Sequence, residues 1–305
     1  MARYPQAILV SCEIPWDENE NLLEDVFRRE VQHTLEHFNH LYIFGTAGEG
    51  HAVTAAQFKR IVQIFYEETR GDDIHPMVGL IALSTGTMLE KLDYAYNMGF
   101  RVFQMALPPW GTLNDDEMLI FFRDVCGAYP DAQFLHYNLI RTGRVLEAHH
   151  YARLIEAIPN LVATKNTGGG LARAAELVSQ AGELQHFLGE ANYLHGCMYG
   201  ECSVLSSFGP MTPLKSKAAY EAGRNHEWEK ALKLQHGFRD LGADLFGPLR
   251  SESRMDGAYD KMLVRLGGFE EMPLRLLSPY KGFTEEQYQV CKQIVLDKYA
   301  DWVVS

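Results

Sequence analysis

Short apolar runs alternate with longer amphipathic stretches over the first two thirds of the chain. The short runs hold four to six residues each and favour β-branched and aromatic side chains, a pattern typical of buried strands. They predict eight strands, at residues 7–12, 41–44, 77–82, 102–106, 133–137, 161–164, 185–188 and 203–206.

The longer stretches between these runs predict helices, because their apolar residues recur at i, i+3, i+4 and i+7. The clearest stripe consists of Phe58, Ile61, Val62 and Phe65. Thr54 and Gln57, just ahead of it, have the spacing of a capping box, so a helix is predicted over residues 54–69. Similar stripes occupy residues 117–129 and 147–158.

Strands that alternate with helices form a parallel sheet, and eight such repeats favour a closed (β/α)8 TIM barrel. A doubly wound open sheet is the alternative, but no G-x-G-x-x-G follows the first strand. We therefore predict a barrel that carries the active site over residues 1–225.

The alternation stops near residue 225. Three amphipathic stretches follow, at residues 228–245, 257–266 and 284–302, and the last opens with another capping-box spacing. Because no Gly/Ser/Pro-rich linker precedes them, we expect residues 226–305 to form a C-terminal helical extension packed on the barrel.

The chain has 305 residues, and 28 lysines and arginines against 40 aspartates and glutamates give a formal charge of −12. This acidic balance argues against nucleic acid or an anionic membrane as the main partner. No apolar run is long enough for a membrane span, and the one at residues 7–10 is too short for a signal peptide. The five cysteines form no C-x-x-C pair, which suits a reducing compartment, so we expect a cytoplasmic enzyme.

The reacting groups of a (β/α)8 barrel lie at the carboxyl ends of its strands. Lys165 directly follows the predicted strand 161–164, so we expect it at the end of a buried strand. Desolvation lowers the pKa of a lysine in such a place, which makes Lys165 a candidate Schiff-base nucleophile. The strand by itself also permits a lysine that points to solvent or pairs with a carboxylate.

Tyr137 and Thr46 follow two other predicted strands at the same end of the barrel. Schiff-base chemistry needs proton transfer, and a tyrosine hydroxyl hydrogen-bonded to a threonine can supply it. The turn at residues 45–48 precedes a helix, and its backbone N–H groups could hold a carboxylate.

Four strand-end motifs occur in order along the chain: G-T-A-G-E (45–49), Y-N with R-T-G (137–143), P-N-L-V-A-T-K (159–165), and L-G-E with S-V-L-S (188–206). Together they resemble the motifs of the dihydrodipicolinate synthase/N-acetylneuraminate lyase family, which belongs to the Schiff-base class I aldolases. The resemblance extends from about residue 6 to residue 300 and implies a (β/α)8 barrel with a helical extension.

The resemblance implies a role for each matching residue. Lys165 would form the imine with pyruvate, Tyr137 would relay the proton, and Thr46 would be its hydroxyl partner. The amides of Thr46 and Ala47 would bind the carboxylate of the 2-oxo acid.

The outer part of the site follows from the same resemblance. Arg141 would meet a second carboxylate or a polar tail, while Gly189 and Leu205 would line the pyruvate pocket through their backbones. Trp110 stands where the synthases carry a tyrosine that reaches into a neighbour's active site. A homo-oligomer, either a tetramer or a dimer, is therefore expected.

Several positions depart from the synthase pattern. Ala47 replaces a second hydroxyl residue, and Asn166 replaces the usual acidic residue after the lysine. The segment before Arg141 is one residue shorter and lacks the proline, whereas Pro108-Pro109 resembles the sugar-acid dehydratase and aldolase branches. The Schiff-base chemistry is expected, but the second substrate is left open.

Three functions follow. The leading hypothesis is a lyase that condenses pyruvate, or a related 2-oxo acid, with an aldehyde or cleaves the corresponding adduct. The first alternative is a 2-keto-3-deoxy sugar acid dehydratase that uses the same lysine imine, and the second is a non-catalytic 2-oxo-acid-binding protein. No cofactor and no metal site is predicted, because the i, i+4 pair of His33 and His37 falls on an outer helix.

Overall fold

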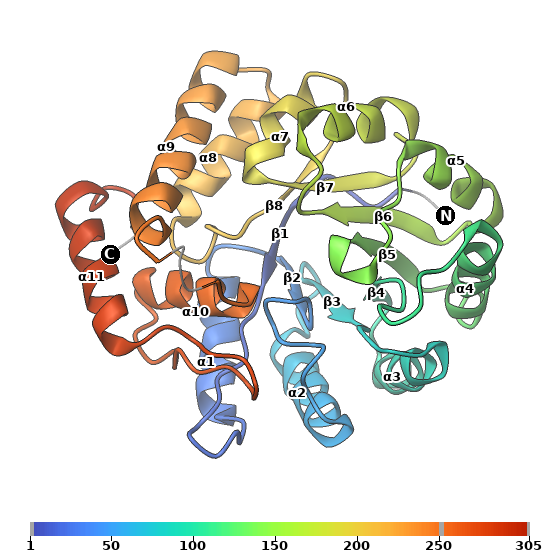
Figure 1. Ribbon diagram of the computed structural model, residues 1–305, viewed down its shortest axis with the longest axis horizontal. Helices are drawn as coiled ribbons and strands as arrows, with labels where there is room; N and C mark the ends of the chain where they lie inside the picture. The colour runs from blue at the N-terminus through green and yellow to red at the C-terminus, as the bar shows by residue number, and fades with distance from the viewer. Residues whose placement is uncertain (1–2, 250–252, 304–305) are drawn as a thin grey trace.

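Eight parallel strands close into a barrel in a computed structural model that describes residues 3–249 and 253–303. The strands follow one another around the barrel in sequence order (Figure 1). They are β1 (Ile8–Ser11), β2 (His40–Ile43), β3 (His75–Gly79), β4 (Val102–Met105), β5 (Gln133–Asn138), β6 (Leu161–Asn166), β7 (Gln185–Gly189) and β8 (Ser203–Leu205). The predicted (β/α)8 barrel is confirmed.

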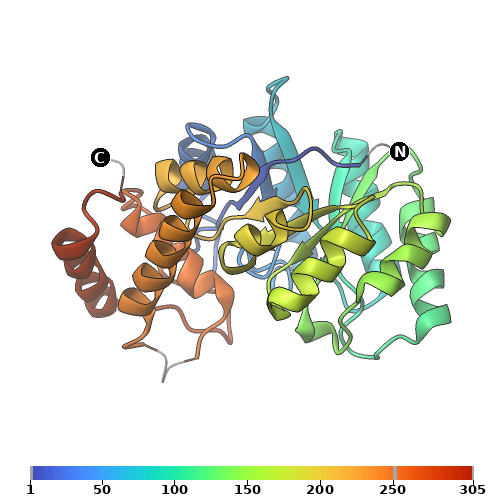
Figure 2. The same ribbon diagram turned by 90° about the horizontal axis from the view of Figure 1, so that it is seen from above.

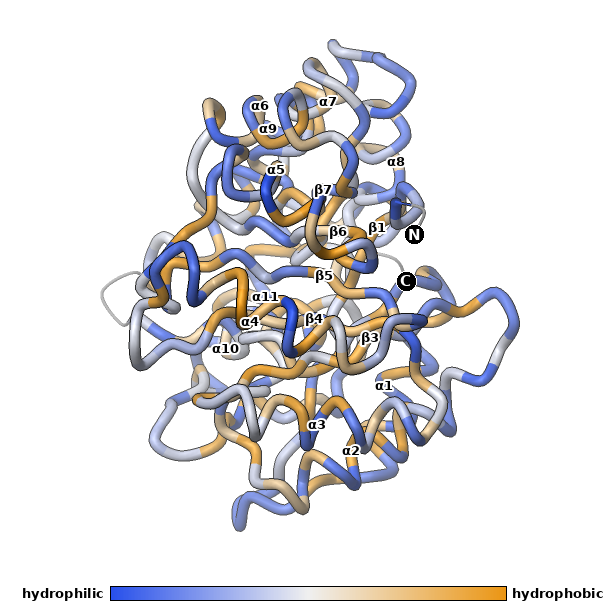
Figure 3. Tube along the Cα trace, turned by 90° about the vertical axis from the view of Figure 1, so that its right-hand side faces the viewer, coloured by the Kyte–Doolittle hydropathy of each residue, from blue (hydrophilic) through white to orange (hydrophobic). Residues whose placement is uncertain are grey.

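A helix follows each of these strands and packs on the outside of the barrel (Figure 1). Figure 3 shows hydrophobic stretches in the centre of the molecule and hydrophilic turns at its margins. The helices are α1 (Glu24–Leu35), α2 (Ala55–Glu68), α3 (Thr85–Met98), α4 (Asp115–Gly127), α5 (Ala148–Ala157), α6 (Gly170–Gln180), α7 (Glu190–Cys197) and α8 (Pro213–Arg224), and a 3-10 turn, η1 (Ile140–Thr142), precedes α5. The expected capping box of Thr54 and Gln57 begins α2.

Two strands, β3 and β6, differ from their predicted ranges by two or more residues at one or both ends, because of their neighbours in the barrel. β3 was expected over residues 77–82 but spans 75–79, since His75 already pairs with His40 of β2. β6 was expected to end at Thr164 but continues to Asn166, which pairs with Asn138 of β5. Lys165 therefore lies within the strand rather than after it.

The first helix is shorter than expected. α1 ends at Leu35, so His33 lies on it, whereas His37 follows the helix and His40 begins β2. The His40 ring stacks on that of His75, with 4.3 Å between the centroids. Within the two described ranges, no group of three or more metal-ligating side chains occurs.

The five cysteines are all free in this structure. Among residues 3–249 and 253–303, no helix combines the length and the apolar character needed to cross a bilayer.

Three further helices, α9 (Trp228–Phe246), α10 (Asp256–Leu266) and α11 (Glu285–Lys298), pack beside the barrel (Figure 2). The capping box of Thr284 and Gln287 begins α11 as expected. The helix was expected to reach Trp302 but ends at Lys298, because the chain then turns to pack Trp302 edge-on against Phe238 of α9. The expected helical extension is thus present.

The backbone turns sharply at Phe44, between β2 and the loop of residues 45–49. Phe44 has a φ of +61°, which is unusual for a bulky residue, and its ring stacks on Phe58 at 5.0 Å. A Cβ atom at Gly79, on the neighbouring strand, would lie 2.2 Å from the carbonyl oxygen of Phe44. Glycine at position 79 therefore permits the turn that places residues 45–49.

A buried ion pair joins this loop to the C-terminal extension. Lys261 of α10 is fully buried, and its Nζ donates to Glu49 Oε1 at 2.7 Å and to the carbonyl of Arg275 at 2.6 Å. Glu49 also accepts from Trp16 Nε1 at 2.9 Å and from the amide of Leu277 at 2.6 Å. This single carboxylate thus connects the segment after β1, the loop after β2 and two parts of the extension.

Lys261→Met should destabilise the protein by about 3–5 kcal/mol, because it leaves the Glu49 carboxylate buried without its cation. The free energy of unfolding in urea measures the effect. Lys292→Met is the matched control, since Lys292 pairs with Glu270 on the surface and should contribute only about 0–1 kcal/mol. Equal losses in the two variants would contradict the structural role assigned to the Lys261–Glu49 pair.

Candidate active site

Lys165 projects into the barrel from β6 and is only 2% exposed. Its strand neighbours in register are Tyr137 on β5 and Phe187 on β7. The Nζ atom donates to the hydroxyl of Tyr42 on β2 at 2.9 Å. It also lies 3.9 Å from the ring centre of Tyr137 and 4.2 Å from that of Tyr42, so aromatic rings enclose the amine.

Burial lowers the pKa of Lys165 to about 7, while the carboxyl groups of Asp256, Asp260 and Glu13 act in the opposite direction. A substantial fraction of the amine is therefore unprotonated near neutral pH. An unprotonated amine is the form that attacks a carbonyl carbon.

Gly45 makes room for this arrangement. A Cβ atom at position 45 would lie 2.7 Å from the ring of Tyr42 and 3.2 Å from the Lys165 Nζ atom. A larger residue there would displace the tyrosine or the amine. Packing against Tyr42 and Lys165 thus explains why glycine occupies the first position of the G-T-A-G-E motif.

Tyr137 and Thr46 meet as expected, with 3.3 Å between their hydroxyl oxygens. Burial raises the pKa of Tyr137 to about 12, partly opposed by the hydrogen bond to Thr46. The phenol is therefore protonated at neutral pH and can donate a proton. The amides of Thr46 and Ala47 donate no hydrogen bond to any residue of the described ranges, which leaves them available to an anion.

Arg141, in η1, is held by an acid that the sequence did not identify. Its guanidinium donates to both carboxylate oxygens of Asp256, from Nη1 at 3.1 Å and from Nη2 at 2.8 Å. Both side chains are partly exposed, at 45% and 38%. Arg141, which was expected to bind a second carboxylate of the substrate, is thus already paired with the Asp256 carboxylate of α10.

Asp260 lies one helical turn after Asp256 on α10. Burial raises its pKa well above the ordinary range, and the charges of Glu13 and Asp256 act in the same direction while Lys165 opposes them. No hydrogen bond or ion pair to Asp260 occurs within residues 3–249 and 253–303. The charge interaction between Asp260 and Lys165 places this carboxyl group near the reactive amine.

The remaining expected residues lie farther from the amine. Trp110, in the loop after β4, is 91% exposed and touches none of the groups around Lys165. Gly189 ends β7 and pairs in register with Leu205 of β8, whose side chain is buried in the barrel interior. Both residues lie at strand ends, and within the described ranges neither forms a hydrogen bond with Lys165.

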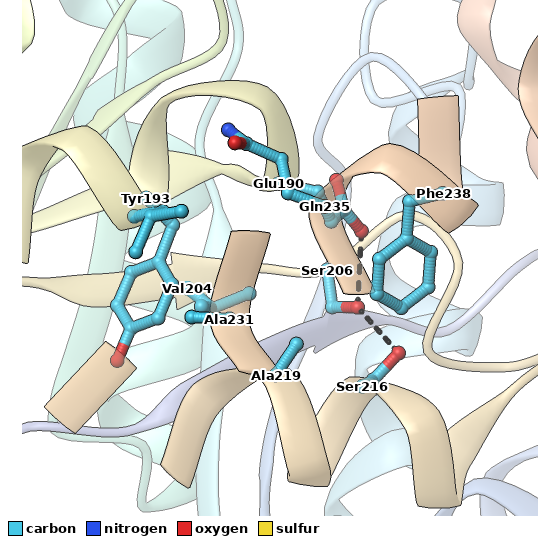
Figure 4. A pocket seen from close by; sticks show the side chains of 10 residues that line it. Glu190, Tyr193, Val204, Ser206, Ser216, Ala219, Ala231, Gln235 and Phe238 are labelled. Atoms are coloured by element: carbon cyan, nitrogen blue, oxygen red, sulfur yellow. Dashed lines mark hydrogen bonds between the residues drawn. The ribbon is translucent and has the colours of Figure 1, made fainter. Parts of the chain in front are cut away.

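Glu190, which follows Gly189, does not contribute to the Lys165 chamber. Its Oε1 atom accepts from the hydroxyl of Ser206 at 3.1 Å and from the amide of Phe208 at 3.0 Å. Ser206 also contacts Ser216 of α8, and Figure 4 shows this chain of polar groups in a small pocket between α7, α8 and α9. The L-G-E motif thus ties the ends of β7 and β8 together.

Asn166 has a similar supporting role. Its side-chain oxygen accepts from Asn138 Nδ2 at 2.9 Å, and its own Nδ2 donates to Thr164 Oγ1 at 2.7 Å. Asn138 in turn bonds both backbone groups of Leu146. The residue after the lysine therefore fixes the ends of β5 and β6 with an amide that both accepts and donates.

Sequence reasoning missed Tyr42, Gln104, Asp256 and Asp260. Gln104 is fully buried on β4, and neither side-chain polar atom has a hydrogen-bond partner in the described part of the chain. Its Nε2 atom would lie 3.6 Å from a Cβ atom at Gly45, so the amide borders the Lys165 chamber. A lone glutamine within an apolar strand was a signal available in the sequence, whereas nothing local indicated that α10 reaches the chamber.

Comparison with known proteins places these features in a family. The model of the dihydrodipicolinate synthetase family matches residues 5–295. A 4-hydroxy-tetrahydrodipicolinate synthase from Helicobacter pylori is 24% identical over 262 residues, covering 81% of this chain and 85% of the relative. An N-acetylneuraminate lyase from Clostridium perfringens is 21% identical over 294 residues, covering 94% and 96%.

Solved structures share the fold. The crystal structure of dihydrodipicolinate synthase from Aquifex aeolicus superposes with a TM-score of 0.84 at 18% identity, covering 99% of this chain and 100% of that one. The family model spans nearly the whole chain, from β1 into α11. The chain therefore belongs to the dihydrodipicolinate synthetase family.

Proposed function

We propose that this protein is a lyase that forms a Schiff base between Lys165 and pyruvate or a related 2-oxo acid. The enamine formed from it would add to an aldehyde, or the reverse reaction would cleave the adduct. The observation that carries the proposal is the buried amine of Lys165, whose pKa is lowered to about 7 and which lies against two tyrosines.

The neighbouring groups suggest how each step would proceed. The amides of Thr46 and Ala47 would bind the carboxylate of the 2-oxo acid, and the free amide of Gln104 would add a donor. Lys165 would attack the ketone, and Tyr137 with Thr46 would deliver the proton needed for water to leave. The resulting iminium would acidify the adjacent C–H bond, which yields the enamine.

A dehydratase acting on a 2-keto-3-deoxy sugar acid is the second candidate. It would use the same imine but expel a hydroxyl group, which needs an acid near the leaving oxygen. Asp260 favours this candidate, because burial raises the pKa of its carboxyl well above the ordinary range, which favours the acid form, and no hydrogen bond to Asp260 occurs in the described ranges. Asp260→Asn should then abolish dehydration while leaving the imine intact.

We further propose that the protein is cytoplasmic, acts on small molecules, and forms a homo-oligomer, either a tetramer or a dimer. Trp110 supports the oligomer, because a large aromatic side chain that is 91% exposed gains free energy when another chain covers it. A third possibility, a protein that binds 2-oxo acids without turnover, predicts a pocket but no covalent adduct.

Incubation with pyruvate and borohydride should attach one reduced pyruvyl group to the wild-type chain, and Lys165→Ala should abolish the adduct. Intact-protein mass spectrometry measures it. Lys91→Ala is the matched control: burial lowers the Lys91 pKa to about 8, yet Lys91 donates to the backbone at Gly50 and Ile81 and should not be needed. No adduct from any short 2-oxo acid would eliminate the lyase and the dehydratase together.

Condensation of pyruvate with aspartate semialdehyde should be slow, below the ordinary enzyme rate of about 10 s⁻¹. Ala47 cannot pass a proton, and the indole N–H of Trp110 donates but cannot relay one as a phenol does. Steady-state turnover with that pair measures the effect. Ala47→Thr combined with Trp110→Tyr should raise the rate, and wild-type turnover at or above about 10 s⁻¹ would show that these substitutions matter little.

Arg141→Ala should leave pyruvate trapping nearly intact but weaken use of a carboxylated second substrate about 10- to 150-fold, the equivalent of about 1.5–3 kcal/mol. Asp256→Asn should strengthen it, because the competing carboxylate is removed. The ratio of kcat to KM for the aldehyde measures both effects.

Arg144→Ala is the control, since Arg144 is engaged by Asp115 and by the carbonyl of Leu113. Loss of activity in Arg144→Ala with activity retained in Arg141→Ala would transfer the role to Arg144. If Asp256→Asn instead weakens binding of the second substrate, that substrate is a neutral, hydroxyl-bearing molecule that Asp256 itself binds.

A further inference from the structure

Glu13 is a buried carboxyl group that the proposed Schiff-base chemistry does not use. It follows β1, is fully buried, and accepts a short hydrogen bond of 2.5 Å from the hydroxyl of Ser11 to Oε1. Its Oε2 atom has no hydrogen-bond partner within the two described ranges. Because an unpartnered carboxylate oxygen is costly in an apolar interior, this side chain readily accepts a proton.

Two hydroxyl groups lie between Glu13 and the reactive lysine. Ser11 on β1 and Tyr42 on β2 are partners in register, so their side chains project from neighbouring strands at the same level of the barrel. Burial raises the pKa of the Tyr42 phenol, and its contact with the Ser11 hydroxyl partly opposes this. The Tyr42 hydroxyl in turn accepts from Lys165 Nζ at 2.9 Å.

We propose that Lys165, Tyr42, Ser11 and Glu13 form an internal proton relay that deprotonates the lysine before it attacks the 2-oxo acid. The inference rests on the proposed Schiff-base function. One proton leaves the Lys165 ammonium for the Tyr42 oxygen, the phenol proton moves to Ser11 Oγ, and the serine proton moves to Glu13 Oε1. No electrons are exchanged, and the products are a neutral amine and a neutral carboxylic acid.

The direction of the hydrogen bonds supports this transfer. Lys165 donates to Tyr42 and Ser11 donates to Glu13, so both end links point from the amine toward the acid, and the middle step requires the phenol to turn toward Ser11 Oγ, its neighbour in register. The amine itself is only 2% exposed, which restricts direct proton loss to bulk water. Tyr137 and Thr46 form a separate pair of hydroxyls, which would remain free for the proton steps on the substrate.

The two ends of the relay are matched in proton affinity. Burial raises the Glu13 pKa to about 7, and burial lowers the Lys165 pKa to about 7, so transfer between them is nearly balanced. Charged groups from every surrounding element contribute to this balance, namely Glu30 of α1, Glu49 after β2, and Asp256, Asp260 and Lys261 of α10.

The test measures the rate of imine formation with pyruvate in a single turnover, by borohydride quenching and intact-protein mass spectrometry, across neutral pH. Glu13→Gln and Ser11→Ala should each slow the reaction about 100-fold near pH 7, the contribution typical of a positioned proton acceptor. The effect should shrink at lower pH, because Glu13 with a pKa of about 7 is then protonated and can no longer accept. The double variant should lose no more than either single one, because both changes interrupt the same path.

A purely electrostatic role for Glu13 predicts the opposite result. Removing a negative charge near Lys165 would favour the neutral amine, so Glu13→Gln would accelerate imine formation near pH 7, where Glu13 is partly ionised, and Ser11→Ala would have little effect. Glu30→Gln is the comparison variant, because Glu30 is equally buried but accepts from the Glu13 amide rather than from Ser11; it alters the charge near Glu13 without interrupting the path, so it should slow imine formation far less than Glu13→Gln.

Ser11→Ala removes only one oxygen and keeps the Glu13 charge, so it tests the relay even if Glu13→Gln does not fold. Wild-type rates in both Glu13→Gln and Ser11→Ala, with the adduct still formed, overturn the relay alone. If only Asp260→Asn slows imine formation, the relay is overturned as well, and Asp260 of α10 is the proton acceptor instead of Glu13. Absence of any adduct in the wild type overturns the proposed function and the relay together.

Discussion

The carboxylate of Glu49 is the interaction on which the arrangement at the barrel mouth depends. It receives hydrogen bonds from Trp16, Lys261 and the amide of Leu277, three segments that are remote from one another in the sequence. Burying one carboxylate and one ammonium is costly, but here every donor has its acceptor, so the cost is offset. Because Lys261 lies on α10, this pair also holds Asp256 and Asp260 of the same helix over Lys165.

The electrostatics around Lys165 follow from two opposing effects. Burial in the barrel disfavours the charged amine, whereas three nearby carboxyl groups and the faces of the Tyr42 and Tyr137 rings favour it. An apolar chamber alone would push the amine further toward neutrality, and carboxyl groups alone would keep it protonated. The balance gives an amine whose pKa is about 7 and which changes protonation near neutral pH, as the proposed Schiff-base function would require.

The residues in the outer part of the chamber differ from the pattern of the synthases that this chain resembles. The Arg141 guanidinium already has a bidentate partner in Asp256, so an anionic substrate must displace a carboxylate to reach it. Ala47 and Trp110 remove hydroxyl groups that the synthases carry. Under the proposed function, a hydroxylated substrate would meet both members of the Arg141–Asp256 pair without displacing either.

The sequence by itself determined the barrel, its helical extension, two capping boxes and the position of Lys165 at the carboxyl end of a strand. Periodicity and capping are local properties, which a single chain displays without its tertiary structure. Family motifs added Tyr137 and Thr46, whose hydroxyls meet as expected. Tyr42 was different: it lies 123 positions from Lys165 in the chain, and only the closure of the barrel brings the phenol and the amine together. The acids of α10 were also decided by tertiary structure, because their place over the chamber depends on how the extension folds back, a long-range packing choice that no local pattern encodes.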